Sequence, residues 1–156
     1  MKTLLIDIDD TLYKHTSPIQ MMNYNNINED KVLTEALNKI KYPKYIYTNA
    51  VFFHANTILN RMNLEDAFNK IYSRGTIPSM KPILNSAISV ENDIKKNSKN
   101  IKTIIFFDDL LPNLNTGKKL GWTTVWIHPE YRKAKMFQFV DLAYPDIKSA
   151  ILDNRF

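Results

Sequence analysis

Short continuous hydrophobic runs alternate along this chain with longer segments in which hydrophobic residues recur every three or four positions. The runs are rich in β-branched and aromatic residues, which is typical of strands buried on both faces of a sheet. They cover residues 3–6, 45–47, 71–72, 102–107 and 123–127. The periodic segments predict amphipathic helices, and these cover residues 29–41, 51–62, 82–96 and 112–120. Pro82 suits the first position of its helix, and Gly121 is a natural stop after the last helix.

The alternation of strands and helices predicts a three-layer α/β fold, in which helices cover both faces of a central parallel sheet of about five strands. The 156 residues are enough for one domain, so we expect a single domain over residues 1–156. Ligand sites of such sheets lie beyond the carboxyl ends of the strands. The residues that directly follow each hydrophobic run are therefore the first candidates for function.

Aspartates directly follow two of the expected strands. Asp7, Asp9 and Asp10 come after the first hydrophobic run, and Asp108 and Asp109 come after the fourth. Clustered carboxylates repel one another unless a cation lies between them. Oxygen ligands without cysteine or histidine favour Mg²⁺ over zinc. A single pair would form a turn or a helix cap just as readily, but two pairs at two strand ends favour a metal site.

Two of these aspartates can act on the same atom of a substrate. Side chains two positions apart in an extended segment share a face, so Asp7 and Asp9 are expected to converge while Ile8 and Asp10 face the other way. Two convergent carboxylates allow one to attack and the other to transfer a proton.

A second set of candidates lies near the starts of two expected helices. Thr48 and Asn49 follow the second hydrophobic run, where either could simply cap the next helix. Hydroxyl and N–H groups at a helix start also bind phosphate, and the neighbouring aspartates favour that interpretation. Pro82 holds Lys81 in an extended conformation at the entrance of its helix. A lysine at such a position is ordinarily solvated, and only the other motifs make Lys81 a candidate. His54 lies within the second expected helix. A core-facing or surface position explains this histidine at least as well as a role in the site.

The composition excludes several classes of protein. The chain has no cysteine and only three histidines, which rules out disulfide scaffolds and thiol catalysis and disfavours a multi-histidine metal site. No hydrophobic run approaches the roughly 18–20 residues that a transmembrane helix needs. Asp7 follows Met1 too closely for a secretory signal. We therefore expect a cytoplasmic protein with no membrane partner.

The net charge raises the question of a nucleic-acid partner. The chain has 21 Lys and Arg against 16 Asp and Glu, for a net charge of +5 and an isoelectric point near 9.3. An isoelectric point above about 9 is typical of nucleic-acid-binding proteins, so a non-catalytic nucleic-acid-binding module is one hypothesis. The lysines are scattered, however, and basic and aromatic residues do not interleave. Nucleic acid is therefore expected only as a substrate.

Four groups of residues, each at the end of a strand or the start of a helix, resemble the four motifs of the haloacid dehalogenase superfamily of phosphatases. In chain order they are Asp7-Ile8-Asp9-Asp10-Thr11, Thr48, Lys81 and Asp108-Asp109. Within that superfamily the chain resembles the pyrimidine 5′-nucleotidase branch. The similar stretches are residues 7–13, residues 48–50 with His54 and Ala55, Lys81 with Pro82, and residues 106–109 with Asn113.

The resemblance implies phosphoryl transfer through an aspartyl-phosphate. Asp7 would be the nucleophile, and Asp9 would protonate the leaving oxygen and then activate water. Lys81 would neutralise charge between the nucleophile and the transferred group. The Thr48 hydroxyl and the Asn49 N–H would bind phosphate oxygens.

The resemblance also implies Mg²⁺ as the cofactor. The ion would be held by a carboxylate oxygen of Asp7, the backbone carbonyl of Asp9 and the carboxylate of Asp108. Asp109 would lie behind these ligands and orient Lys81 or a metal-bound water. Asn113, in the same loop, would donate a supporting hydrogen bond.

One feature departs from the nucleotidase branch, whose members carry a helical cap domain between the first and second motifs. Only 36 residues separate Thr11 from Thr48, and 32 separate Thr48 from Lys81, and both intervals must also hold core elements. We therefore expect a capless or minimally capped enzyme. The polar segment after Tyr13 is the nearest candidate for a lid, and a second copy of the chain is another cover for the open site.

The leading hypothesis is thus a Mg²⁺-dependent phosphomonoester hydrolase acting on a small phosphorylated molecule such as a nucleotide 5′-monophosphate. The alternative substrate is a phosphorylated macromolecule, either a nucleic-acid end or a phosphoprotein, which an open site would admit.

Overall fold

The structure is a computed structural model that describes residues 1–15, 17–18 and 21–156. In these residues the sheet has six parallel strands in the order β3-β2-β1-β4-β5-β6. The strands are β1 (Lys2–Ile6), β2 (Lys44–Val51), β3 (Lys70–Arg74), β4 (Thr103–Asp108), β5 (Thr123–Ile127) and β6 (Leu142–Tyr144). The three-layer α/β fold is confirmed, and the prediction of about five strands is corrected to six.

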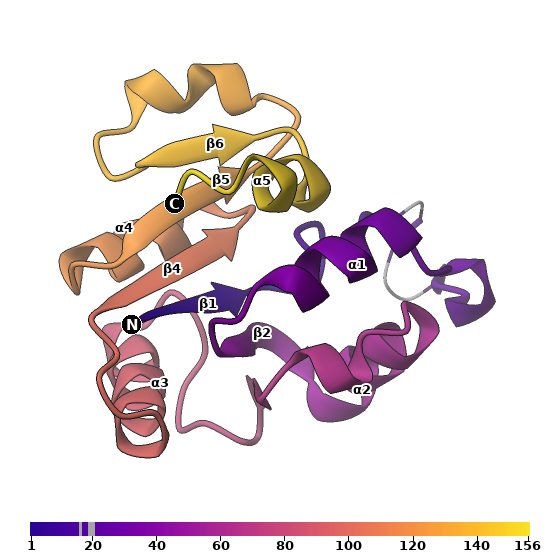
Figure 1. The fold of residues 1–156 in the computed structure, drawn as a ribbon, viewed down its shortest axis with the longest axis horizontal. Helices are drawn as coiled ribbons and strands as arrows, with labels where there is room; N and C mark the ends of the chain where they lie inside the picture. The colour runs from indigo at the N-terminus through magenta and orange to yellow at the C-terminus, as the bar shows by residue number, and fades with distance from the viewer. Residues whose placement is uncertain (16, 19–20) are drawn as a thin grey trace.

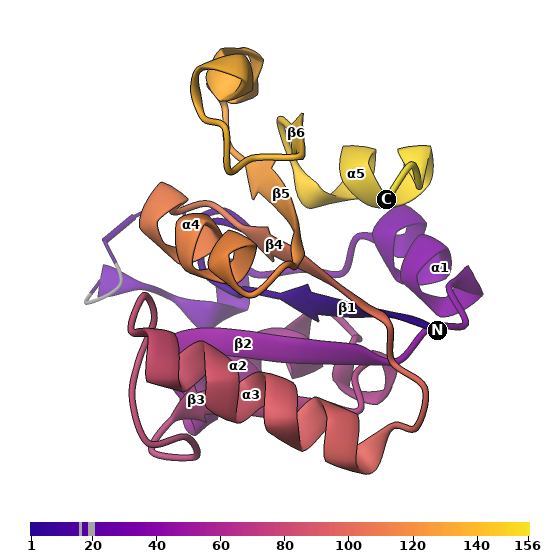
Figure 2. The same ribbon diagram turned by 90° about the vertical axis from the view of Figure 1, so that its left-hand side faces the viewer.

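The helices lie on both faces of the sheet (Figure 1). They are α1 (Lys31–Lys39), α2 (Phe52–Arg61), α3 (Leu84–Asn97), α4 (Leu111–Lys119) and α5 (Ile147–Asp153). Helices α3 and α4 cover one face, and α1, α2 and α5 cover the other (Figures 1 and 2). No helix of the described residues combines the length and the apolar character that a membrane crossing requires.

Alternating strand residues supply two separate cores, one on each face of the sheet. Leu4 and Ile6 of β1 pack with the first core, against α1, α2 and α5, whereas Leu5 between them packs with the second core, against α3 and α4. All three side chains are fully buried. Successive side chains of a strand point to opposite faces, so a strand covered on both sides reads as an unbroken hydrophobic run.

The sixth strand is too short to be recognised in the sequence. Strand β6 has three residues, of which Tyr144 alone is buried. It pairs with β5 after the 3₁₀ segment Tyr131–Met136, and the ring of Phe137 packs edge-on against Trp126 of β5 at 5.6 Å. Tertiary packing on β5, rather than a local hydrophobic pattern, places this strand.

The expected helix boundaries hold at Gly121 but not at Pro82. Gly121 follows α4 with a φ of 78°, the left-handed conformation that glycine adopts most readily. Helix α3 begins at Leu84, two residues after Pro82. The backbone N–H and C=O of Lys81 are both bonded to the side chain of Asn49, at 2.8 and 3.0 Å. Because Asn49 occupies both backbone hydrogen-bonding groups of Lys81, the helix starts later than predicted.

The described residues of the segment after Tyr13 form no more than a minimal cap. Its described part contains one 3₁₀ turn, Tyr24–Asn26, which packs on α2. The guanidinium of Arg61, on α2, donates to the carbonyl oxygens of Asn25 and Ile27 at 3.0 and 3.3 Å. Hydrogen bonds from Arg61 therefore hold this part of the candidate lid against α2. Residues 16, 19 and 20 of the candidate lid lie outside the described residues.

We expect Gly117→Ala to destabilise the protein, although alanine ordinarily favours a helix over glycine by about 1 kcal/mol. A Cβ at Gly117 of α4 would lie 2.9 Å from Cε3 of Trp122 and 3.1 Å from Cδ1 of Phe106. Both rings are buried and pack edge-to-face, so the overpacking should cost about 1–3 kcal/mol. Urea unfolding measures the difference. The exposed Lys119→Ala on the same helix should change stability by less than about 0.5 kcal/mol.

Candidate active site

A small cavity opens at the carboxyl ends of β1, β2 and β4, the edge of the sheet where polar residues were expected. Its volume is about 260 Å³. The lining residues are Asp7, Asp9, Asp10, Thr48, Asn49, Ala50, Lys81, Asp109, Leu110 and Asn113. The chain also has a cavity of about 400 Å³ between the loop after β1 and the starts of α1 and α5. We take the smaller one as the candidate site because the buried carboxylates and the buried lysine converge there.

The chain turns sharply after β1, and this turn brings Asp7 and Asp9 to the cavity. The Asp7 N–H still donates to the carbonyl of Phe107 in β4, at 3.0 Å. Asp10 then adopts a left-handed φ of 58°, and the N–H of Leu12 returns to the carbonyl of Ile8 at 2.9 Å. Asp7 and Asp9 thus reach the same cavity through a turn, where an extended segment was expected, and Asp10 lines the cavity as well.

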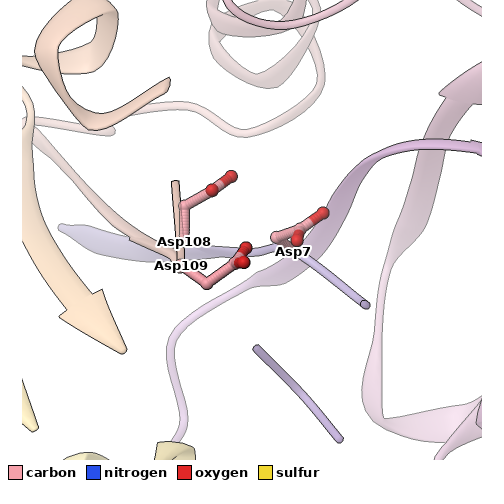
Figure 3. Close-up of side chains that lie close together, drawn as sticks. All are labelled: Asp7, Asp108 and Asp109. Carbon is pink, nitrogen blue, oxygen red and sulfur yellow. The ribbon is translucent and has the colours of Figure 1, made fainter. Parts of the chain in front are cut away.

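Three carboxylates meet at the ends of β1 and β4. The side chains of Asp7, Asp108 and Asp109 each offer an oxygen within 4.8 Å of the others (Figure 3). Asp108 is fully buried and Asp7 nearly so. Asp109, which was expected behind the metal ligands, stands within this cluster. The carboxylate of Asp9, in contrast, is directed to other partners.

Lys81 bridges two of the three carboxylates. Its Nζ donates to Oδ1 of Asp7 at 2.8 Å, to Oδ2 of Asp108 at 2.6 Å and to the carbonyl of Tyr47 at 2.8 Å. The side chain is 3% exposed. The side chain of Asn49 holds the Lys81 backbone, so the end of β2 sets the position of the ammonium group. The ammonium group was expected between Asp7 and the transferred group, with Asp109 orienting it. In the structure it bonds to Asp7 and to Asp108.

The buried charges shift one another's pKa values. Burial raises the pKa of Asp7 to about 8, with Asp108 and Asp109 adding to the effect and Lys81 opposing it. Burial, together with the charge of Asp108, raises the pKa of Asp109 to about 7. Burial lowers the pKa of Lys81, but Asp108 and Asp7 outweigh it and hold that pKa above its ordinary value. The site therefore contains more carboxylates than one lysine neutralises, and a second cation would be stabilised there.

Two neighbours orient the carboxylates. The amide of Asn113, on α4, donates to both oxygens of Asp108 at 3.0 and 3.1 Å, which is the supporting role expected of it. The hydroxyl of Thr11 lies 3.4 Å from an oxygen of Asp7 and 3.4 Å from one of Asp109. Both contacts hold the acids in place without adding charge.

Thr48 and Asn49 do not cap the following helix. Strand β2 continues to Val51, which is the N-cap residue of α2 and makes no side-chain capping bond. Thr48 is buried, and its Oγ1 accepts a hydrogen bond from the N–H of Ala50 at 3.1 Å. The capping interpretation is therefore wrong, and Thr48 lies in the cavity wall.

Sequence reasoning did not assign three residues that surround Asp9. Its Oδ1 accepts a hydrogen bond from the hydroxyl of Tyr13 at 2.6 Å, and it lies 2.7 Å from Nε2 of His54 and 3.3 Å from Nε2 of His15. Burial raises the pKa of Asp9, but the hydrogen bonds from His54 and Tyr13 outweigh it and hold that pKa below its usual value. His54 shares the buried face of α2 with Ala55 and Ile58. In the sequence, the sign that His54 has a buried polar partner is its position within the hydrophobic stripe of this helix.

Comparison with solved structures identifies the fold. The L-2-haloacid dehalogenase of Xanthobacter autotrophicus matches with a TM-score of 0.62 and 14% sequence identity, over 85% of this chain and 63% of that one. A Thermotoga maritima protein assigned as a β-phosphoglucomutase matches with a TM-score of 0.74 and 14% identity over all of both chains. A Bacillus subtilis protein assigned as a haloacid dehalogenase-type hydrolase, whose structure holds magnesium, matches with a TM-score of 0.62 and 15% identity, over 81% of this chain and 53% of that one.

The chain spans less than two thirds of the length of the Xanthobacter and Bacillus proteins. No protein-family model matches the sequence. The likeness to the solved structures therefore rests on the arrangement of the strands and helices. The chain has the fold of the haloacid dehalogenase-type hydrolases.

Proposed function

We propose that the protein is a phosphomonoester hydrolase that works through a phosphoryl group carried on Asp7. The observation that supports this most directly is the buried cluster of Asp7, Asp108 and Asp109 with Lys81 inside it. The cluster lies where the fold places ligand sites, beyond the ends of neighbouring parallel strands. It offers a nucleophile, a fixed cation and hard oxygen ligands within one small cavity.

The residues fit a Mg²⁺ ion by their chemistry. Asp7 and Asp108 would hold it with their carboxylates and Asp9 with its backbone carbonyl, while Asp109 stands close enough to bind the ion or one of its waters. Oxygen ligands suit Mg²⁺. Burial is the main cause of the raised pKa values of Asp7 and Asp109, and the charges of neighbouring carboxylates add to it. When bound, the ion supplies positive charge that offsets the repulsion between the carboxylates and the phosphate oxygens.

In the first step, a carboxylate oxygen of Asp7 forms a bond to phosphorus as the bond between phosphorus and the leaving oxygen breaks. Asp9 gives a proton to that oxygen. In the second step, water attacks the phosphorus of the aspartyl-phosphate and loses a proton to Asp9. The bond to Asp7 then breaks and releases inorganic phosphate.

The hydrogen bonds to Asp9 suit the second of these steps. Because its pKa is held low, Asp9 is ionised in the free protein at neutral pH and ready to act as a base. For the first step it must carry a proton. The negative charge of an arriving phosphate raises the pKa of a nearby carboxyl, so substrate binding itself favours the protonated form.

Phosphate oxygens would be bound by groups already in the cavity wall. The Thr48 hydroxyl uses its lone pair for the N–H of Ala50 and keeps its proton for an anion. Lys81 contributes a buried positive charge beside Asp7. Donors that are fixed before the substrate arrives stabilise developing charge without reorganisation.

The substrate is a small phosphate ester in the leading proposal, with a nucleotide monophosphate as the first compound to test. A phosphorylated macromolecule is the second candidate, favoured by the surroundings of the site. The cavity of about 260 Å³ is smaller than the pockets of about 300–1,000 Å³ that hold drug-sized ligands. Five exposed hydrophobic side chains either line the cavity or lie within three positions of a residue that does, and they are Phe52, Phe53, Met80, Ile83 and Leu110.

The test is release of inorganic phosphate by the purified protein, with and without Mg²⁺. An aryl phosphate reports the chemistry, free nucleotides report the first substrate class, and 3′- or 5′-phosphorylated oligonucleotides and phosphopeptides report the second. Mg²⁺-dependent release from the aryl phosphate supports the proposal. Salt-sensitive oligonucleotide binding without hydrolysis of any ester would instead favour the nucleic-acid-binding module.

We also expect Mg²⁺ to stabilise the protein more at high pH than at low pH. An unfolded aspartate titrates near 3.8, whereas Asp7 titrates at about 8 and Asp109 at about 7 in the folded chain. The folded metal-free chain therefore binds more protons, and the contribution of these groups to the free energy of unfolding falls as the pH rises from about 4 to about 8.

A bound cation must displace those protons, so its stabilising effect grows over the upper part of this range. Thermal unfolding should show a larger Mg²⁺-induced rise in Tm near pH 8.5 than near pH 5.5. NaCl at equal ionic strength is the control. An equal rise at both pH values would contradict the assignment of the cluster as the metal site.

A further inference from the structure

The carboxylate of Asp9 is held by a set of donors that come from two separate parts of the chain. Tyr13 lies on the loop after β1 and donates to Oδ1 at 2.6 Å. His54 lies on α2 and places Nε2 2.7 Å from the same oxygen. Among the described contacts, every side-chain hydrogen bond of Asp9 uses Oδ1, which leaves Oδ2 for proton transfer.

These donors act through Asp9 and not on the substrate. Neither Tyr13 nor His54 lines the cavity that contains Asp7 and Lys81. His54 is 6% exposed and contacts Asp9, which does line the cavity. A buried imidazole at this place has no part in the chemistry proposed for Asp7, Lys81 and the metal ligands.

A second hydrogen bond fixes the imidazole itself. Nδ1 of His54 lies 2.8 Å from the hydroxyl of Tyr24. Because the ionised Asp9 can only accept, Nε2 of His54 carries a proton and donates it. In the neutral ring Nδ1 then accepts the hydroxyl proton of Tyr24, so both the orientation and the tautomer of the ring are set.

The segment that carries Tyr24 is itself attached to α2. Arg61, on the same helix as His54, donates to the carbonyl oxygens of Asn25 and Ile27, at 3.0 and 3.3 Å. Two short hydrogen bonds, from Tyr24 to His54 and from His54 to Asp9, therefore link the segment after Tyr13 to the site.

We infer that His54, oriented by Tyr24, is a positioning residue that presents Oδ2 of Asp9 to the leaving-group oxygen. The inference rests on the proposed function and names a residue that this function does not require for nucleophilic attack. Together with Tyr13, His54 fixes the rotation of the carboxylate about its last bond. Misplacement of a reacting group by about 1 Å can cost roughly 10²-fold in rate.

The test compares two substrates that differ in their need for a proton. p-Nitrophenol is acidic enough to leave as its anion, whereas an alkyl alcohol must be protonated as it leaves. The quantity to measure is kcat/KM, because it reports the steps up to phosphoryl transfer to Asp7 and not the later hydrolysis. Loss of a well-positioned general acid costs about 10²–10⁴-fold, and it should appear chiefly with the alkyl phosphate.

Three variants of His54 separate positioning from simple packing. The amide nitrogen of His54→Gln can reach the place of Nε2, so we expect kcat/KM within about fivefold of the wild type for both esters. His54→Asn, whose amide reaches only the place of Nδ1, and His54→Ala should both lose about 10²-fold on the alkyl phosphate. Their loss on p-nitrophenyl phosphate should stay below about fivefold. Asn60→Ala, at an exposed position of α2, should match the wild type with both esters.

Each outcome bears on the inference in a defined way. Equal losses with both esters, or no rescue by His54→Gln, would show that the residue only supports the fold. Should the His54 variants unfold, Tyr13→Phe, which removes one hydroxyl donor to the same oxygen, must give the same selective loss. If the wild type hydrolyses neither ester, the proposed function fails and this inference with it, a result distinct from an active wild type with unselective variants.

Discussion

Asp7→Asn is expected to reduce phosphate release by about 10⁴-fold or more, because an amide cannot replace the attacking carboxylate. The wild-type protein should give a phosphoryl adduct on Asp7 when the reaction is stopped rapidly in acid, and the variant should give none. Initial rates of phosphate release and mass spectrometry of the stopped reaction measure the two effects.

The variant should remain folded, so that the loss is one of chemistry. Asparagine has nearly the size of aspartate, and Lys81 keeps its bonds to Asp108 and to the carbonyl of Tyr47. Asp66→Asn is the matched control, since Asp66 is exposed on the 3₁₀ turn Glu65–Ala67 and should behave as the wild type. Comparable turnover by Asp7→Asn and the wild type would refute Asp7 as the nucleophile.

Lys81→Met is expected to have the largest effect on stability, because it removes the buried cation that separates Asp7 and Asp108. Breaking a buried ion pair by removing one partner costs about 3–5 kcal/mol. At roughly 2–4 °C for each kcal/mol in a domain of this size, Tm should fall by about 10 °C near neutral pH. Phosphate release should fall as well, by about 10²-fold or more, because a fixed donor to the transferred group is lost.

The destabilisation by Lys81→Met should depend on pH in a defined direction. Without the ammonium group, Asp7 loses the main influence that opposes the burial, which already raises its pKa. The folded variant therefore holds its carboxyl protons to higher pH than the unfolded chain, and the free energy of unfolding falls as the pH rises. The difference in Tm from the wild type should be smaller near pH 5 than near pH 8.

A surface lysine provides the comparison. Lys95→Met removes an exposed lysine that pairs with Glu91 on the same helix, and exposed pairs contribute only about 0–1 kcal/mol. It should leave both Tm and activity close to the wild-type values. A Tm for Lys81→Met as high as that of Lys95→Met would mean that Lys81 does not balance the carboxylates in solution.

The elements that carry the site could be predicted because their patterns are local. The hydrophobic runs at residues 3–6 and 102–107 end where Asp7 and Asp108 begin, and parallel strands expose their carboxyl ends at one edge. The segments containing Thr48 and Lys81 reach the same edge for the same reason. These residues line or contact one cavity in the structure.

Predictions failed where position depends on contacts between distant segments. Strand β6 has three residues and takes its place from packing on β5. Helix α3 starts after Pro82 because the side chain of Asn49 holds the backbone of Lys81, 32 positions away. Neither effect leaves a periodic signal in the sequence.

The sequence by itself determined which residue types end the central strands, and hence the acidic character and the location of the site. Only the tertiary structure decided how those residues are paired: Lys81 with Asp7 and Asp108, and Asp9 with Tyr13 and His54. The physical reason is range. Hydrophobic periodicity reports on neighbours along the chain, whereas most of these partners are chosen by the packing of distant strands and helices. Lys81 lies 27 positions from Asp108 and 74 from Asp7, and Asp9 lies 45 from His54.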